Sequence, residues 1–164
     1  MDLSKPATAI GPWQHATWLH VGGLVAIGFP GDSFLFALSW NGRGLFDLRT
    51  FERIARDHED PTGADWVAAD HLSALGIGEF SDLMIPIVGL WGGKGHTRTP
   101  DGWRLENRVE DGTVLSSSLM DATGSTVIPV PLTSITEYRA VSFGPSGRSL
   151  ILACSSDIQV LTRD

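Results

Sequence analysis

The sequence predicts a mainly β fold: a single antiparallel sheet domain, arranged as propeller-like hairpins, a barrel or a sandwich, with one or two short helices. Three observations support this class. Apolar runs have the length of strands, turn residues are frequent (19 Gly and 9 Pro among 164 residues), and a motif beginning at Ala26 is nearly restated near the C-terminus. This length suits one hydrophobic core. We therefore expect a flexible N-terminal arm over residues 1–12 and one β-rich domain over residues 13–164.

The motif at residues 26–47 is the clearest β signal. The apolar run 34–38 lies between the turn residues 30–33 and the pair Asn41-Gly42, which leaves room for a strand but not for a helix. Asn41-Gly42 predicts a hairpin because both residues tolerate a positive φ. A further strand should follow at 44–48. Residues 49–57 fit either a helix or a fourth strand, and we favour the strand because it would complete the repeated unit.

The remaining elements follow from pattern and turn signals. Residues 66–75 are the best helix candidate, with apolar residues at 68, 72 and 75 and Gly76 as a stop signal. Residues 13–20 are a first strand or an irregular cover over the core. Further strands or extended segments are expected at 84–91 (with Pro86 at an edge or bulge), 103–109, 126–132 and 158–161.

The repeated motif also carries a family resemblance. Its residues are Phe29, Gly31, Asp32 and Ser39 in the first copy and Phe143, Pro145, Gly147 and Ser155 in the second. These units resemble the hairpin repeats of WD-repeat-type β-propellers, over about a third of the chain. The resemblance implies propeller-like hairpins and an interaction surface. The sequence between the copies shows no further copy, so we expect a compact sheet domain rather than a complete propeller.

Composition limits the classes of partner. Twelve Lys and Arg residues against nineteen Asp and Glu give a net charge of −7, which opposes nucleic-acid binding and favours a basic partner. The sequence has neither a long apolar run nor a basic segment followed by an apolar one, so we expect a cytoplasmic protein that does not bind membranes. Cys154 lies in an apolar run and is interpreted as a small core residue.

Motifs for catalysis, cofactors and metals are incomplete. The Gly-rich stretch 89–95 lacks the Ser or Thr after Lys94 that a phosphate-binding loop requires, and residues 144–147 have the wrong spacing for a nucleophile elbow. His15 and His20 are five residues apart, which suits neither a helix face nor a strand face. The sequence therefore predicts no catalytic set, no cofactor and no metal site.

Candidate binding residues fall into three groups. The first group lies at the tip of the central hairpin and consists of Trp40, Asn41 and Arg43. The second surrounds the Gly-rich hairpin 89–103 and consists of Trp91, Lys94, His96, Asp101 and Trp103. The third, Asp57, Glu59 and Asp60, belongs to the acidic segment 57–70, which contains no Lys or Arg. Trp and Arg are the residue types that dominate binding hot spots. The alternatives are that Trp91, Trp103 and Trp40 face the core, that the polar residues beside them belong to ordinary loops, and that the acidic segment is a solvated loop.

Two functions are consistent with these observations. The favoured hypothesis is a non-catalytic protein-binding module with an acidic face for a basic partner; its specific version is a bacterial accessory or toxin-neutralising, immunity-type protein. The alternative is a small enzyme or small-molecule-binding domain with a pocket at hairpin 89–103. There, His96 would be a base oriented by Asp101, and Trp91 or Trp103 would form an apolar wall.

Overall fold

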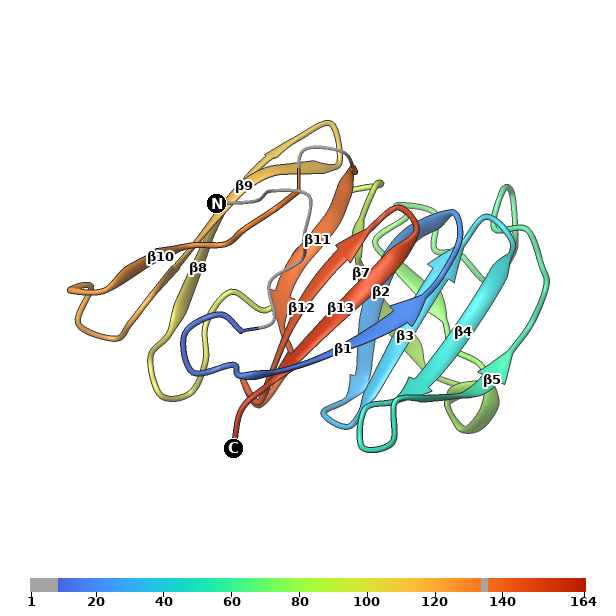
Figure 1. Ribbon diagram of the computed structural model, residues 1–164. Coiled ribbons are helices and arrows are strands. Elements are labelled where there is room, and N and C mark those ends of the chain that lie inside the picture. The colour runs from blue at the N-terminus through green and yellow to red at the C-terminus, as the bar shows by residue number, and fades with distance from the viewer. Residues whose placement is uncertain (1–8, 134–135) are drawn as a thin grey trace.

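A computed structural model describes residues 9–133 and 136–164 of the chain. Within these ranges the larger of two antiparallel sheets has seven strands (Figure 1). Their order is β1 (His15–His20), β13 (Asp157–Thr162), β12 (Ser149–Cys154), β11 (Tyr138–Phe143), β9 (Thr113–Met120) and β10 (Val127–Pro129), with β8 (Arg104–Glu110) paired to β9.

The smaller sheet has six strands in the same described ranges. Their order is β5 (Glu52–Arg56), β4 (Gly42–Asp47), β3 (Phe34–Ser39), β2 (Leu24–Gly31), β7 (Met84–Gly89) and β6 (Ser73–Leu75). The 3₁₀ turn η1 (Gly78–Phe80) joins β6 to β7. The mainly β class is confirmed, and the division into two sheets agrees with the sandwich among the three expected arrangements.

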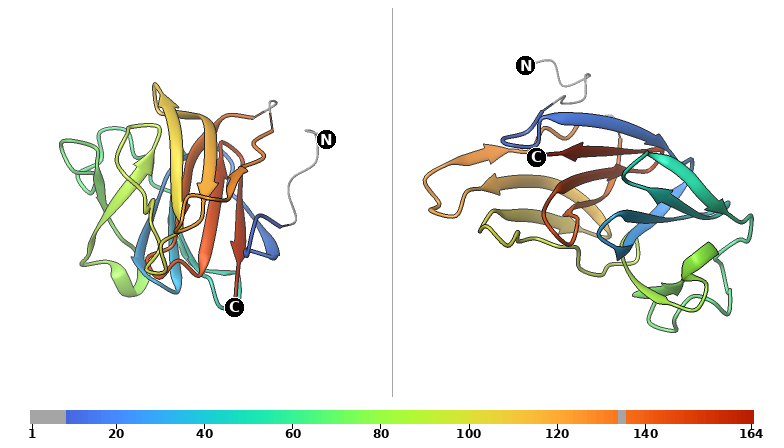
Figure 2. Two further views of the ribbon diagram at one scale, coloured as in Figure 1. Left: turned by 90° about the vertical axis from the view of Figure 1, so that its left-hand side faces the viewer. Right: turned by 90° about the horizontal axis from the view of Figure 1, so that it is seen from below.

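The two sheets pack face to face, as in a β-sandwich (Figure 2). One buried cluster takes side chains from both: Leu24, Ile27 and Leu35 from the smaller sheet meet Ile151 and Val160 from the larger one. Successive residues of a strand point to opposite faces of its sheet. The intervening residues of the same strands therefore face away from this shared cluster, and their apolar side chains must be buried by other parts of the chain.

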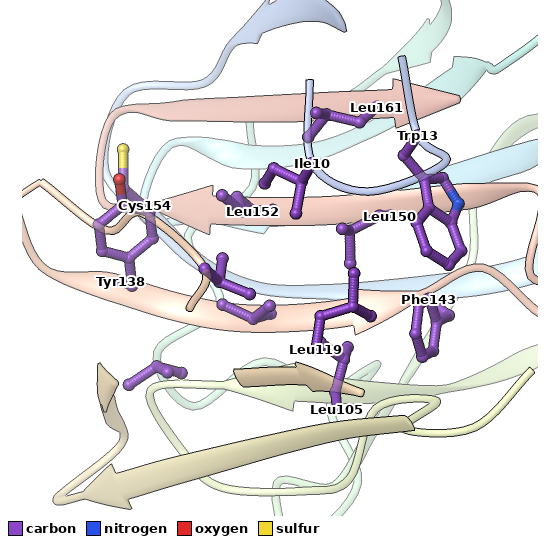
Figure 3. Close-up of a cluster of buried hydrophobic side chains, with 13 residues drawn as sticks. Ile10, Trp13, Leu105, Leu119, Tyr138, Phe143, Leu150, Leu152, Cys154 and Leu161 are labelled. Carbon is purple, nitrogen blue, oxygen red and sulfur yellow. The ribbon is translucent and has the colours of Figure 1, made fainter. Parts of the chain in front are cut away.

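The outer faces of the central strands are also buried. On β12, Leu150 and Leu152 belong to a second cluster on the far side of the larger sheet, which Figure 3 shows together with Trp13 and Phe143. On β3, Phe36 belongs to a third cluster, on the far side of the smaller sheet. Burial on both faces explains why these strands are continuous apolar runs without polar alternation.

The two copies of the repeated motif form equivalent hairpins. The first copy is the meander β2–β3–β4 and the second is β11–β12–β13, one in each sheet. Their turns touch, since the backbone N–H of Ser146 donates to Asp32 Oδ1 at 2.8 Å. The antiparallel hairpins are thus present, but a propeller is not found in the described ranges, where neither sheet is closed or curled.

The predicted helix at 66–75 is wrong. Residues 69–72 form a turn and a bend, and Ser73–Leu75 form strand β6. His71 has a φ of 62°, and the Asp70 side chain accepts a hydrogen bond from the Leu72 amide, which together turn the chain. Ala74 is fully buried and pairs with Ile85 of β7, so tertiary pairing overrides the weak helical pattern. No α-helix occurs in residues 9–133 and 136–164.

Several local predictions are confirmed. Residues 52–56 are strand β5 rather than a helix, and residues 15–20 are strand β1. The hairpin at Asn41-Gly42 is present, but its two loop residues are Trp40 and Asn41, and Asn41 does not have a positive φ. Gly42 is required for a different reason. Its φ is 129°, and a Cβ there would lie 2.3 Å from the Asp57 carbonyl oxygen.

Two further segments refine the predictions. In β7, residues 84–86 pair with β6 and residues 87–89 pair with β2, so Pro86 lies where the strand changes partner. Strand β13 is interior, because β1 pairs along its outer side with His15 opposite Thr162. Of the predicted N-terminal arm, residues 1–8 lie outside the described residues, while Ile10 is buried and bridges to Trp13.

Trp13 joins the N-terminal segment to the core. It is fully buried, its Nε1 donates to the Gly147 carbonyl at 3.1 Å, and its ring contacts those of Trp103 and Phe143. We predict that Trp13→Ala lowers the free energy of unfolding by about 3–5 kcal/mol, the cost of a cavity of this size. Urea denaturation measures this loss.

The matched control is Trp18→Ala, on the same N-terminal segment, where the side chain is 39% exposed. It should change the free energy of unfolding by no more than about 1 kcal/mol. Equal losses in both variants would contradict the assignment of Trp13 to the core.

Candidate functional site

Three aromatic rings form a surface cluster at one end of the smaller sheet. Trp40 lies in the β3–β4 turn and contacts the ring of Trp91, which follows β7, with ring centroids 5.9 Å apart. Trp91 also contacts His71 at 5.0 Å. Trp40 is 41% exposed and His71 is exposed, while Trp91 is half-buried between them. Trp40 and Trp91, which were predicted as binding residues of separate hairpins, therefore contact each other, and His71, which was not predicted, contacts Trp91.

The acidic segment 57–70 lies next to this aromatic cluster. Asp70 directly precedes His71 in the chain, and the side chains of Glu59, Asp60, Asp65 and Asp70 are exposed. The Thr62 amide donates to Asp60 at 2.8 Å, and this hydrogen bond holds the pKa of Asp60 below its ordinary value. The exposure of these carboxylates makes them accessible to a partner.

Arg43 is buried and holds parts of the fold together, so it is not an exposed binding residue. Its Nε donates to Asp57 at 2.6 Å, its Nη1 donates to the Leu75 carbonyl at 2.8 Å, and its guanidinium lies 4.0 Å from the ring centre of Trp66. Its Nη2 also reaches Glu59 at 3.4 Å. Arg43 thus connects β4 to the acidic segment and to β6. Asp57 is used inside the fold, while Asn41 is exposed beside Arg43 at a small hollow.

His96 and Asp101 have different partners. His96 packs its ring 5.5 Å from Phe29, its backbone N–H donates to Ser142 Oγ at 2.9 Å, and its carbonyl accepts from the Phe143 amide. Asp101 instead makes two hydrogen bonds with the guanidinium of Arg163, at 2.7 and 2.8 Å. Asp101 therefore does not orient His96 in this structure, and the predicted acid–base pair is not formed.

The two tryptophans of the Gly-rich hairpin are also separated. Trp103 contacts Trp13 edge to face at 5.5 Å and packs against the core of the larger sheet. Trp91 belongs to the surface cluster with Trp40. The residues of the predicted site at 89–103 therefore do not converge. Trp91 lies at the surface, Trp103 packs against the core, and Asp101 pairs with Arg163.

The glycines of this hairpin mainly serve close packing. A Cβ at Gly93, whose φ is 90°, would lie 2.1 Å from the Ile87 carbonyl oxygen, and one at Gly95 would lie 2.6 Å from Ser142 Oγ. A Cβ at Gly92 would meet nothing within 4 Å. Gly92 therefore borders open space, whereas Gly93 and Gly95 allow the loop to lie against its neighbours.

Two hollows flank this loop. One is a cavity of about 380 Å³ between the end of β7, the β8–β9 hairpin and β11. The other, of about 200 Å³, is lined by Phe29, Pro86 and His96. Lys94 lines both hollows and is exposed. Arg139 of β11 lines the larger one, and its Nε donates to the Leu24 carbonyl at 3.0 Å.

Searches for other kinds of site and for relatives gave negative results. Among the described residues, no three His, Cys, Asp or Glu side chains are close enough together to hold a metal ion. The described chain also contains no helix with the length and hydropathy to cross a membrane. A scan against protein-family models and a search of curated proteins found no match.

Two residues of these surfaces were missed by sequence reasoning. His71 was placed inside the predicted helix, where no pattern indicates contact with Trp91. Arg139 had a visible signal, since it is a lone cation within the apolar strand β11, where burying a charge requires a partner. Such a residue needs hydrogen-bond acceptors, and here they are the Leu24 carbonyl and the Glu137 side chain.

The Asp101–Arg163 pair predicts a pH dependence. The Arg163 guanidinium, followed by the Thr99 hydroxyl, holds the pKa of Asp101 well below its usual value of 3.8. Because the folded pKa is the lower one, the pair stabilises the fold above about pH 4, and this contribution is lost as the pH falls below that value. The Asp101 side chain is 55% exposed, so solvent screening limits the contribution to about 0.2–1 kcal/mol.

We expect Asp101→Asn to lower the free energy of unfolding by this amount at pH 7 and by progressively less below pH 4. Denaturant titration at several pH values measures the difference. Asp82→Asn is the control, because Asp82 has no hydrogen bond or ion pair within the described ranges. A loss that is the same at pH 7 and pH 2 would show that the ion pair is not its source.

Proposed function

We propose that the protein is a non-catalytic protein-binding module that uses the aromatic cluster Trp40–Trp91–His71 and the adjacent acidic segment 57–70 to bind a basic partner. The aromatic cluster is the observation that carries this proposal. Exposed tryptophans contribute large apolar area while keeping a polar N–H group, which makes them frequent centres of protein interfaces.

The charge beside the cluster indicates the kind of partner. Glu59, Asp60, Asp65 and Asp70 are exposed on a segment without Lys or Arg. Carboxylates at the rim of an interface attract a basic protein and raise its association rate, an effect that salt screens. Arg43 fixes the start of this segment to the smaller sheet, because its guanidinium donates hydrogen bonds to Asp57 and to the Leu75 carbonyl.

A bacterial accessory or immunity-type role is the specific version of this proposal. It rests on the acidic net charge of −7 and on an interface that requires complementarity of shape and charge but no catalytic group. The enzyme form of the alternative hypothesis required His96 and Asp101 at one site, and these residues have separate partners. This geometry favours a binding function over the enzyme.

The test is affinity capture from the source organism with immobilised protein, followed by measurement of the captured partner's Kd. Trp40→Ala should weaken binding about 30-fold or more, as expected for a hot-spot tryptophan. Asp65→Asn combined with Asp70→Asn should slow association at low salt but have little effect at high salt.

Trp18→Ala is the matched control, since Trp18 is 39% exposed and Trp40 is 41% exposed, but Trp18 lies on β1 of the other sheet. It should leave the Kd unchanged. The proposal fails if no protein is captured at low salt, or if Trp18→Ala weakens binding as much as Trp40→Ala does.

A further inference from the structure

The cavity of about 380 Å³ beside the Gly-rich loop lies where the two sheets approach each other. We propose that this cavity binds a small molecule that has one carboxylate and an apolar body. The proposal does not depend on the protein-binding surface, because it rests on different residues and on a different chemistry. Four properties of the cavity support it: its size, its walls, its charge and the state of Arg139.

Size and walls define the body of the ligand. A volume of about 380 Å³ falls at the lower end of the range for small-molecule sites. Val88, Val109 and Val141 form apolar walls, and Ala140 leaves space between them. Gly92 adds open backbone, since a Cβ there would meet no atom within 4 Å. These surfaces fit an aliphatic chain or a single ring.

The charged residues that line the cavity are both cations. Lys94 and Arg139 line it, and no Asp or Glu does so within the described residues. In a chain with a net charge of −7, a cavity lined by cations without carboxylates favours an anion over a neutral or cationic ligand. Lys94 has no ion pair or hydrogen bond in the described part of the chain, so its ammonium group is available.

Arg139 is the residue that specifies a carboxylate. Its side chain is only 10% exposed, its Nε donates to the Leu24 carbonyl, and its Nη1 donates to Glu137 at 3.1 Å. Its Nη2 has no hydrogen-bond partner within the residues described, and it is open to solvent, because no buried side-chain nitrogen or oxygen in this part of the chain lacks a partner. Glu137 is 69% exposed, so water screens its charge and it neutralises the guanidinium incompletely. A ligand carboxylate would replace water at Nη2 with a charge-assisted hydrogen bond.

Asn107 is a fixed part of the wall. Its Nδ2 donates to the Val141 carbonyl at 2.8 Å, and its Oδ1 accepts from Ser117 Oγ at 2.6 Å. Both polar atoms of its amide are therefore used within the fold. The contacts that distinguish one anion from another would come from Arg139 and Lys94.

The test is titration of the full chain with octanoate, which has one carboxylate and an aliphatic body, and with 1-octanol as its neutral counterpart. Isothermal calorimetry gives the Kd, and amide chemical shifts of Gly92, Val109 and Ala140 report the location. Octanoate should bind saturably and at least tenfold more tightly than octanol, and these three amides should shift. Arg139→Gln should weaken octanoate binding about tenfold or more, as expected for one charge-assisted hydrogen bond.

Lys94→Gln should weaken binding about threefold or more through lost charge attraction, and because Lys94 is exposed this variant should fold even if Arg139→Gln does not. Arg148→Gln is the control for net charge, since Arg148 is exposed and does not line this cavity. It should leave the Kd unchanged, as should Trp40→Ala. The proposal is overturned if octanoate shows no saturable binding, if octanol binds as tightly, or if Lys94→Gln and Arg148→Gln have equal effects.

Discussion

Burial of the inner faces of the two meanders against each other is the constraint on which the rest of the structure depends. Ile27 and Leu35 of the smaller sheet share a cluster with Ile151, Ile158 and Val160 of the larger one. Each such side chain contributes about 1.5–3 kcal/mol when it is buried, whereas an exposed ion pair contributes about 0.2–1 kcal/mol. Apolar packing, rather than the surface ion pairs, therefore decides how the sheets face each other, and polar contacts such as Ser146 to Asp32 adjust the fit.

The same packing determines where the two candidate surfaces lie. The outer face of the smaller sheet is covered by the segment from Asp57 to Phe80, and Arg43 holds that segment through Asp57 and the Leu75 carbonyl. His71 is thereby brought to Trp91 and the acidic residues are left exposed. Where the sheets approach each other near β11, Arg139 crosses from the larger sheet to the Leu24 carbonyl of the smaller one, beside the cavity.

Local signals in the sequence were sufficient for the strands but not for their partners. The run at 34–38 and the turns around it predicted β3, and burial on both faces explains its unbroken apolar character. The pairing of β1 with β13 joins residues near opposite ends of the chain, for which the sequence carries no local signal. The helix at 66–75 was mispredicted because the contact between Ala74 and β7 outweighs a short periodic pattern.

For the candidate site residues too, the sequence indicated positions but not contacts with distant parts of the chain. Trp40 was a candidate contact residue because it lies at a hairpin tip, with burial in the core as the alternative, and it is 41% exposed. Lys94 was a candidate because it lies in a Gly-rich loop, and it is exposed. Arg43 was predicted as a contact residue because residue type alone does not show that Asp57, fourteen positions later, returns to bind it. Asp101 was paired with His96 by proximity in sequence, whereas its partner, Arg163, lies at the far end of the chain.

The arrangement of the two sheets is tested most directly by nuclear Overhauser effects between methyl groups in a sample labelled on Ile, Leu and Val. The account predicts cross-peaks that connect Ile27 and Leu35 of the smaller sheet with Ile151, Ile158 and Val160 of the larger one, because these methyl groups share one cluster. Cross-peaks confined to residues within each sheet would show that the sheets do not pack face to face, and would contradict the account.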